Sequence, residues 1–195
     1  PGETVKVKGK LSHNDDVREN VEIYFINEGY RQTLMAESDG EGNFSAEFTP
    51  MPGQMGEFIA GACYPGENSR EKSASFNIYG LTRQTWEPIT CETEPDEQFS
   101  SKFVIYNPAS VALTGLTVKA DNVPANCSLN VACAERIDGG GKAEVEFTIT
   151  PLAPTSGKDW ERINLTVNSA EGAVLPVAIY HYCRSARAQM DASVT

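Results

Sequence analysis

Three oxygen-bearing side chains in the first half of the chain have the spacing at which a cation-binding loop begins. Asp39, Glu41 and Asn43 alternate with Gly40 and Gly42. Carboxylate and amide oxygens are calcium ligands, and calcium loops place them at alternating positions. The bidentate glutamate that closes such a loop is missing, and Asp39-Gly40 is also typical of a hairpin turn. We therefore expect a turn and no metal or cofactor, with Asp39, Glu41 and Asn43 as the candidates if a cation binds.

Residue types that support catalysis are present but are not arranged for it. The two histidines, His13 and His181, have no second histidine or glutamate at the spacing that metal hydrolases use. The sequence contains no Gly-x-Ser-x-Gly elbow, phosphate-binding glycine loop or Cys-x-x-Cys pair. A group of carboxylates that would suit a glycosidase is better interpreted as a solvated loop; it comprises Glu92, Glu94, Asp96 and Glu97. We predict that the chain is not an enzyme.

The five cysteines leave two interpretations open. Cys127 and Cys133 lie on one predicted strand, about 20 Å apart at ~3.3 Å per residue, which is too far for a disulfide. Cys91 and Cys183 bracket the second half, and first and last strands are neighbours in many sandwiches, so a Cys91–Cys183 bridge is one interpretation. The favoured one is that all five are reduced and act as small buried hydrophobic residues.

Two tryptophans are the candidates for stacking on a sugar ring. Trp160 follows Lys158-Asp159, so we expect it in an exposed loop and consider it first for a glycan site. Trp86 is expected at a domain junction, packed between the two domains. Large aromatic side chains in a sandwich are more often core or junction residues than ligand platforms, and this is the favoured interpretation of both.

Composition and charge remove several classes of partner. The chain has 195 residues, 40% of them hydrophobic and 22% charged, and a formal net charge of −11. The acidic excess is present in both halves and repels phosphate backbones and anionic lipid surfaces. No segment has the roughly 18 apolar residues that cross a bilayer. We expect no nucleic-acid partner and no membrane insertion.

A two-residue alternation of apolar and polar side chains runs through the first half and predicts half-buried strands. The clearest strand is Val21 to Ile26, in which Val21, Ile23 and Phe25 point inward. Segments of the same kind, separated by turns such as Asn27-Glu28-Gly29, predict seven strands in residues 4–80, as in a small sandwich.

The motifs of this half resemble the transthyretin-like or carboxypeptidase-regulatory-like family of Ig-like modules. The resemblance covers residues 4–80 and is carried by Lys8-Gly9-Lys10-Leu11, Val21-Glu22-Ile23, Ser38-Asp39-Gly40-Glu41-Gly42-Asn43-Phe44, and Gly56-Glu57-Phe58-Ile59-Ala60. It implies a spacer or adhesive repeat in a secreted or surface protein.

The second half alternates again from about Phe99 to Tyr182, and its last strand is predicted at Val177 to Tyr180. It resembles the Ig-like modules related to bacterial cell adhesion, on the residues Tyr106-Asn107-Pro108, Leu116-Thr117-Val118 and Gly141-Lys142-Ala143-Glu144-Val145. That likeness concerns the fold alone.

The sequence therefore predicts an all-β chain of two tandem Ig-like antiparallel β-sandwiches. The expected organisation is a sandwich at 1–80, a junction at 81–88, a second sandwich at 89–184, and a tail or the start of another domain at 185–195. Its abrupt ends are expected to be boundaries cut from a longer polypeptide.

The expected function is that of a non-enzymatic spacer or interaction segment of a larger secreted or cell-surface bacterial protein. Its partners would be other domains of the same polypeptide and a glycan or a host or cell-surface protein. The alternative is a carbohydrate-binding accessory module of a polysaccharide-degrading enzyme. A third interpretation, a protease or hydrolase, would require turnover by the chain alone.

Overall fold

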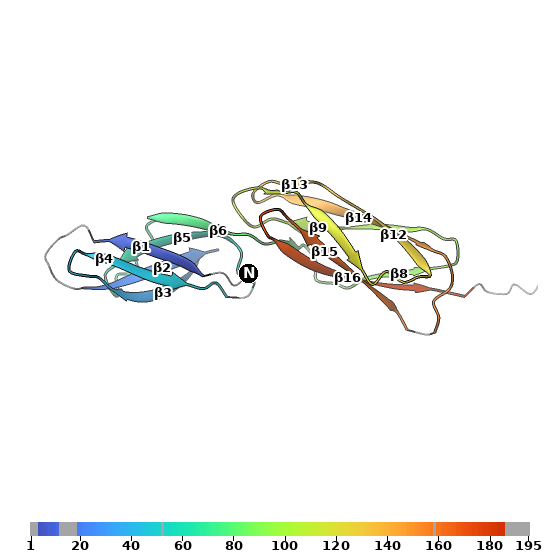
Figure 1. Ribbon diagram of the computed structural model, residues 1–195, viewed down its shortest axis with the longest axis horizontal. Helices are drawn as coiled ribbons and strands as arrows, with labels where there is room; N and C mark the ends of the chain where they lie inside the picture. Colours follow the sequence, from blue (N-terminus) through green and yellow to red (C-terminus); the bar gives the residue numbers. More distant parts are fainter. Residues whose placement is uncertain (1–3, 12–18, 52, 158, 186–195) are drawn as a thin grey trace, which may run out of the picture. The chain divides into compact units, whose positions relative to one another are not determined.

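The computed structural model describes residues 4–11, 19–51, 53–157 and 159–185, and every regular element in them is a β-strand (Figure 1). His13 therefore lies outside the described residues, as does the tail apart from Ser185. The chain divides into two compact units. Unit 1 comprises Pro1–Gly80 and Pro108–Val111, and unit 2 comprises Leu81–Asn107 and Ala112–Thr195. The predicted fold class, two Ig-like β-sandwiches, is confirmed.

Unit 1 is a sandwich of two unequal layers. Its strands are β1 (Val5–Lys10), β2 (Asn20–Asn27), β3 (Tyr30–Glu37), β4 (Asn43–Phe48), β5 (Gly56–Cys63) and β6 (Ala74–Ile78). One layer is the antiparallel pair β1–β4, and the other is the antiparallel sheet β3-β2-β5-β6. The described part of unit 1 thus holds six strands, whereas the sequence predicts seven.

The core of unit 1 follows the predicted alternation. Val21, Ile23 and Phe25 on β2 are buried, and they face residues of the β1–β4 layer. The rings of Phe25 and Phe48 are stacked with centroids 4.1 Å apart, which joins the two layers directly. Such offset aromatic pairs add about 0.5–1.5 kcal/mol to the effect of burial alone.

The turn between β2 and β3 shows how local sequence sets the register of this sheet. Glu28 and Gly29 have φ angles of 50° and 82°. Two successive residues with positive φ form the tight turn whose twist matches that of a hairpin, and glycine adopts it without strain. The turn aligns Asn27 with Tyr30, and from there the strands pair as far as Asn20 and Glu37.

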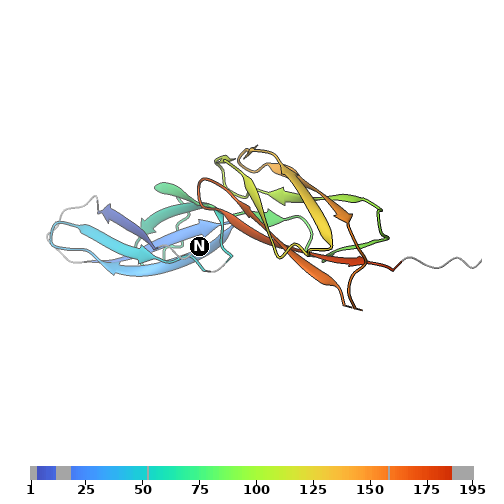
Figure 2. The ribbon, with the colours of Figure 1, turned by 45° about the vertical axis from the view of Figure 1, so that its right-hand side comes forward.

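Unit 2 is a sandwich of two four-stranded sheets. The strands are β7 (Thr82–Arg83), β8 (Ile89–Thr93), β9 (Phe99–Tyr106), β10 (Leu113–Thr114), β11 (Thr117–Asp121), β12 (Cys127–Cys133), β13 (Arg136–Ile137), β14 (Lys142–Pro151), β15 (Glu161–Asn168) and β16 (Val174–Cys183). One sheet has the order β11-β15-β16-β8 and the other β12-β14-β9-β7, with β10 and β13 as a short separate pair. In Figures 1 and 2 the long strands β15 and β16, drawn in orange and red, lie side by side.

One pairing in unit 2 departs from the predicted antiparallel arrangement. β8 pairs with β16 in parallel, from Ile89 opposite Ile179 to Thr93 opposite Cys183. The first and last long strands of this unit are therefore neighbours, as considered for the cysteines. The predicted junction at 81–88 is also different, because Thr82–Arg83 forms β7 and pairs with β9 inside unit 2.

A carboxylate fastens the short strand β10 to the turn before β16. Glu171 accepts hydrogen bonds from the Thr114 hydroxyl at 2.6 Å and from the Thr114 backbone N–H at 3.0 Å. These bonds, the hydroxyl contact first, lower the pKa of Glu171 from 4.5 to about 2. Hydrogen bonds to the charged form of a carboxyl group favour that form.

Replacing Glu171 with Gln should make unit 2 less stable at neutral pH but not in strong acid. A carboxylate whose pKa is lower in the folded state stabilises that state above pH 4.5, and the effect is lost as the pH falls from 4.5 towards 2. Urea unfolding of the wild type and Glu171→Gln across this range should show the difference between them shrinking. Glu135→Gln, at an exposed side chain, is the control. A difference independent of pH would contradict the assignment.

Candidate functional site

A groove of about 700 Å³ lies along one side of unit 1, and we call it the β1 groove. Its walls come from β1, from the inner faces of β2 and β5, and from the connection between β5 and β6. The apolar part of the wall consists of Val7, Leu11, Val21, Ile23, Ala60 and Ala62. Polar side chains, including Lys8, Lys10, Glu67 and Glu71, line the rest. A concave, partly apolar site with a few polar groups is typical of a binding surface.

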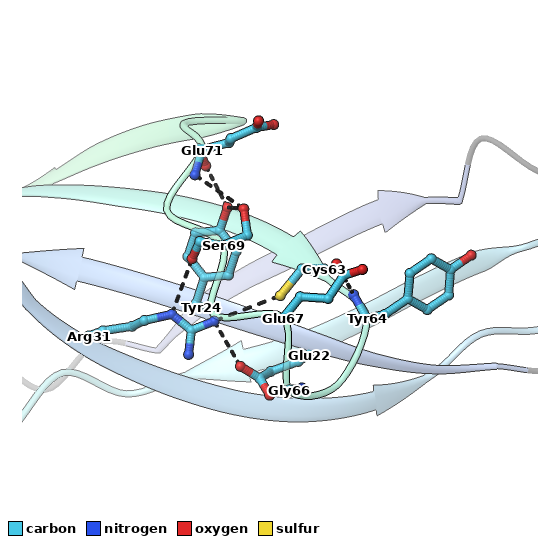
Figure 3. Close-up of polar contacts among 9 residues, drawn as sticks. All are labelled: Glu22, Tyr24, Arg31, Cys63, Tyr64, Gly66, Glu67, Ser69 and Glu71. Carbon is cyan, nitrogen blue, oxygen red and sulfur yellow. Dashed lines mark hydrogen bonds and ion pairs between the residues drawn. The ribbon is translucent and has the colours of Figure 1, made fainter.

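A polar cluster covers the outer face of the four-stranded sheet beside this groove (Figure 3). Arg31 on β3 lies over the ring of Tyr24 on β2, with the guanidinium carbon 4.7 Å from the ring centroid. The same guanidinium group forms an ion pair with Glu22 at 2.7 Å, and both side chains are largely buried. The Tyr24 side chain itself is fully buried although it points away from the core.

The cluster ties the β5–β6 connection to the sheet. The Tyr24 hydroxyl donates to the Glu71 carbonyl at 2.6 Å, and Arg31 Nε donates to the Ser69 carbonyl at 3.3 Å. The Gly66 backbone N–H donates to Glu22 Oε2 at 3.3 Å. The hydrogen bond from Arg31, followed by that from Gly66, lowers the pKa of Glu22. Tyr24, Arg31 and Glu22 use their polar atoms in hydrogen bonds and an ion pair within the cluster. The cluster therefore holds a loop in place rather than offering a reactive group.

A glycine on the neighbouring strand makes room for this arrangement. Gly61 on β5 is paired with Tyr24, and a Cβ at Gly61 would lie 2.3 Å from the tyrosine hydroxyl. The same Cβ would lie 2.7 Å from the Glu71 carbonyl oxygen. No motif in the sequence predicts the cluster. The available signal was the unbroken apolar run Ile23-Tyr24-Phe25-Ile26, because such a run indicates a strand buried on both faces.

The cation candidates form a turn. Asp39 Oδ1 accepts hydrogen bonds from the backbone N–H groups of Glu41 and Asn43 at 2.9 and 2.8 Å. The Asn43 side chain donates to Asp39 Oδ2 at 3.1 Å, and the hydrogen bonds from Asn43 lower the pKa of Asp39. Asp39 thus acts as the organiser of the β3–β4 turn. Across the described ranges, no group of three or more His, Cys, Asp or Glu side chains is placed to hold a metal ion.

The two tryptophans lie in different surroundings. Trp160, directly before β15, is 45% exposed and packs against Tyr182 with ring centroids 5.8 Å apart. Trp86, which lies between β7 and β8 of unit 2, is 82% exposed, and its packing between the two domains stays a prediction. It lines a shallow groove of about 230 Å³ together with Arg83, Pro176 and Tyr180, all from unit 2.

The cysteines are all free, and the register explains why Cys91 and Cys183 do not form the bridge considered above. Cys91 lies opposite His181, and Cys183 lies opposite Thr93. A shift of two residues at ~3.3 Å each across an interstrand spacing of ~4.8 Å separates the two Cα atoms by about 8 Å. That exceeds the ~7 Å limit for a disulfide. Burial, with a smaller effect of Cys127, raises the pKa of the Cys91 thiol to about 12.

Of the four carboxylates at residues 92–97, Glu92 lies on β8 and the other three lie in the turn that follows it. Glu97 Oε2 accepts from the Glu94 backbone N–H at 3.1 Å, and Glu92 pairs with Arg184 at 2.5 Å. The side chains of Glu92 and Arg184 are both well exposed. The first contact lies within the β8–β9 turn, and the second joins β8 to the residue after β16; neither forms an acid–base pair.

His181 is the one histidine in the described part of the chain, and it is completely buried. Its Nε2 shares a hydrogen bond with the Thr93 hydroxyl at 3.0 Å, while Nδ1 has no hydrogen-bond partner. Glu161 Oε2 lies 3.7 Å from Nδ1. Burial lowers the pKa of His181, and the nearby Glu161 carboxylate opposes this effect.

Comparisons with known proteins agree with the fold and go no further. No protein-family model matches, so neither family resemblance is established, and no curated protein matches. Among solved structures, a PapD-like domain of human CEP192 is 11% identical, with 55% of this chain and 87% of that chain covered and a TM-score of 0.38. The major pilin subunit BcpA of Bacillus cereus is 6% identical, with 93% and 70% covered and a TM-score of 0.37.

An I-band fragment of titin is 10% identical over 94% of this chain and 61% of that chain, with a TM-score of 0.39. The chain spans only 48% of another match, the secreted serine protease VesC from Vibrio cholerae. At such identities and TM-scores these likenesses carry no functional argument. No helix in the described residues has the length and apolar character required to cross a membrane.

Substituting Ala for Gly61 should destabilise unit 1 by about 1–3 kcal/mol, because the added methyl group displaces Tyr24 or the Glu71 carbonyl. Chemical denaturation followed by circular dichroism measures this loss. Gly40→Ala is the matched control, since nothing lies within 4 Å of its Cβ position. Equal stability of the two variants would show that Tyr24 is not held in place by Gly61.

Acid should destabilise unit 2 through His181. Because the pKa of His181 is lower in the folded state than its usual 6.5, the unfolded chain binds a proton first as the pH falls. Stability is therefore full above pH 6.5 and decreases below it. Calorimetric melting between pH 7.5 and 5 should show this decrease, and Glu161→Gln should extend it to lower pH. A His181→Leu variant with the same pH dependence as the wild type would contradict this role.

Proposed function

We propose that the chain is a non-enzymatic structural and adhesive segment of a larger secreted or cell-surface bacterial protein. It acts as a spacer that holds a distal domain away from the cell and as an interaction module. Other domains of the same polypeptide are its first partners, with a host or cell-surface protein as a further one.

The observation that carries the spacer role is the parallel pairing of β8 with β16. Tension along the polypeptide enters unit 2 at β7, which is held by only two residue pairs to β9, and once this short pair opens it acts on the start of β8 and on the end of β16. In a parallel pair these two forces act at opposite ends of the same ladder. The hydrogen bonds between Ile89–Thr93 and Ile179–Cys183 are then loaded together in shear, and none can be peeled open before the others. Such an arrangement supports a load-bearing role.

Unit 1 provides an internal comparison. Its first strand, β1, pairs with β4, and its last strand, β6, pairs with β5. Its terminal strands lie in different sheets and are not joined by a ladder. Tension on unit 1 is therefore resisted by packing between layers rather than by a sheared set of backbone hydrogen bonds.

Single-molecule pulling on the full chain should give two unfolding events, with the higher force belonging to the longer unit, unit 2. The contour length released identifies each event. Proline is introduced separately at Ile89 and Thr90, whose N–H groups point to opposite sides of β8. The proline that removes an N–H pointing towards β16 should lower the unfolding force of unit 2. The proline that removes the N–H on the other side of β8 is the control. Equal forces for the two units would overturn the load-bearing proposal.

A second candidate is the carbohydrate-binding accessory module, which a specific observation favours at Trp86 rather than at Trp160. Trp86 is the more exposed ring and borders the shallow groove with Tyr180, whereas Trp160 packs on Tyr182. An exposed indole beside a groove is a surface on which a sugar ring stacks. Arg83 adds a cationic group on the same wall.

Affinity gel electrophoresis of the full chain in soluble polysaccharides separates the two candidates. A spacer should migrate at the same rate with and without every glycan. Retention that is abolished by Trp86→Ala and kept by Trp160→Ala would replace the spacer proposal with the glycan-binding one. Hydrolysis of the polysaccharide by the chain alone would contradict both.

A further inference from the structure

Among the described residues of unit 1, a strand edge without a pairing partner lies next to the β1 groove. In the described residues β1 pairs only with β4, and β6 is the last strand of its sheet. The two layers meet at the other side of the sandwich, where β4 contacts β3. A further strand would therefore belong beside β1.

The β1 groove has the form of a strand-binding site. Val7 and Leu11 from the β1 side and Ala60 and Ala62 from β5 line it, and all but Ala60 are only half buried. The unpaired backbone edge of β1 runs along the same groove. An extended segment placed there would bond to the edge with its backbone and direct every second side chain onto the apolar wall.

The charges of β1 argue against pairing with another β1. Lys6, Lys8 and Lys10 alternate along this strand and are exposed. Two β1 strands side by side would bring these lysines together, and like charges on facing strands are destabilising. Edge lysines protect against this kind of self-pairing. The occupant must be a segment that carries no matching row of positive charges.

Residues 186–195 of the chain, which lie outside the described part, have the required pattern. Ala186, Ala188, Met190, Ala192 and Val194 alternate with polar residues through the whole segment. Ten residues are enough to cover the six of β1. Most of the apolar set is small, which suits a wall built partly of alanine. The segment carries one positive side chain, Arg187, and one negative, Asp191, so it has no row of positive charges to oppose the lysines.

We propose that residues 186–195 of one copy of the chain insert as a strand between β1 and β5 of unit 1 in a second copy. This rests on the interaction role proposed above and names its partner. Because donor and acceptor surfaces differ, the contact is head-to-tail and produces either a closed ring or an open chain of copies.

The first test compares the full chain with a chain that ends at Ser185. Sedimentation equilibrium should show concentration-dependent association of the full chain and a monomeric truncated chain. A peptide of residues 186–195 should bind the truncated chain with one site per molecule, measured by fluorescence anisotropy. A peptide of the same composition with the alternation destroyed is the control. Hydrogen exchange should show new protection of the β1 amides when the peptide binds, as strand addition requires.

The second test blocks the groove. Ala74 lines it and is exposed, so Ala74→Trp should fill it and weaken peptide binding by about tenfold or more. Ala132→Trp, at an exposed strand position of unit 2, is the matched control. If Ala74→Trp fails to fold, Met190→Asp in the peptide provides the same comparison without altering the receptor.

Absence of peptide binding, binding that Ala74→Trp and Met190→Asp leave unchanged, or a monomeric full chain would each overturn the proposal. None of these results affects the pulling experiment, which tests the load-bearing role of unit 2. Conversely, a low unfolding force for unit 2 would leave the proposed strand insertion in unit 1 unaffected.

Discussion

A β-sandwich excludes water from its core only where both layers cover the same apolar face, and unit 1 meets this condition on one side alone. The pair β1–β4 has to cover the inner face of four strands. Contact between β4 and β3 closes one side, and the aromatic pair Phe25–Phe48 secures the middle. The opposite side is left with the β1 groove and an unpaired backbone edge. The β1 groove of this unit arises because a layer of two strands faces a layer of four.

The two units solve the burial problem in different ways. In unit 1 the outer face of the larger sheet is covered by the β5–β6 connection, which Tyr24 and Arg31 hold in place. In unit 2 each sheet has four strands, so the layers match, and β8 joins the edge of its sheet beside β16. The result is one unit with an unpaired strand edge among its described residues and one whose last strand, β16, is paired with β8.

Most of the fold could be predicted from local pattern, because alternation and turn residues act over a few positions. The inward positions Val21, Ile23 and Phe25 and the Glu28-Gly29 turn are examples. The parallel ladder between Ile89–Thr93 and Ile179–Cys183 could not be predicted, since no local signal records a partner so far along the chain. The six strands in the described part of unit 1 each match a segment of alternating residues, because alternation is a local property.

The candidate sites depended still more on long-range geometry. Asp39 was recognised as a turn residue because its partners are its neighbours in sequence. The groove beside Trp86 could not be predicted, since it depends on residues from β16, far along the chain. The cluster around Tyr24 was missed because its glycine partner, Gly61, lies on another strand.

The placement of the indole rings gives the molecule a built-in optical label. Both tryptophans of the chain, Trp86 and Trp160, belong to unit 2, while unit 1 contains only tyrosine and phenylalanine as aromatic residues. Light absorbed by indole alone therefore excites one half of the protein. Trp160 packs against Tyr182 beside the end of β16, so its emission should report the opening of that strand without any added dye.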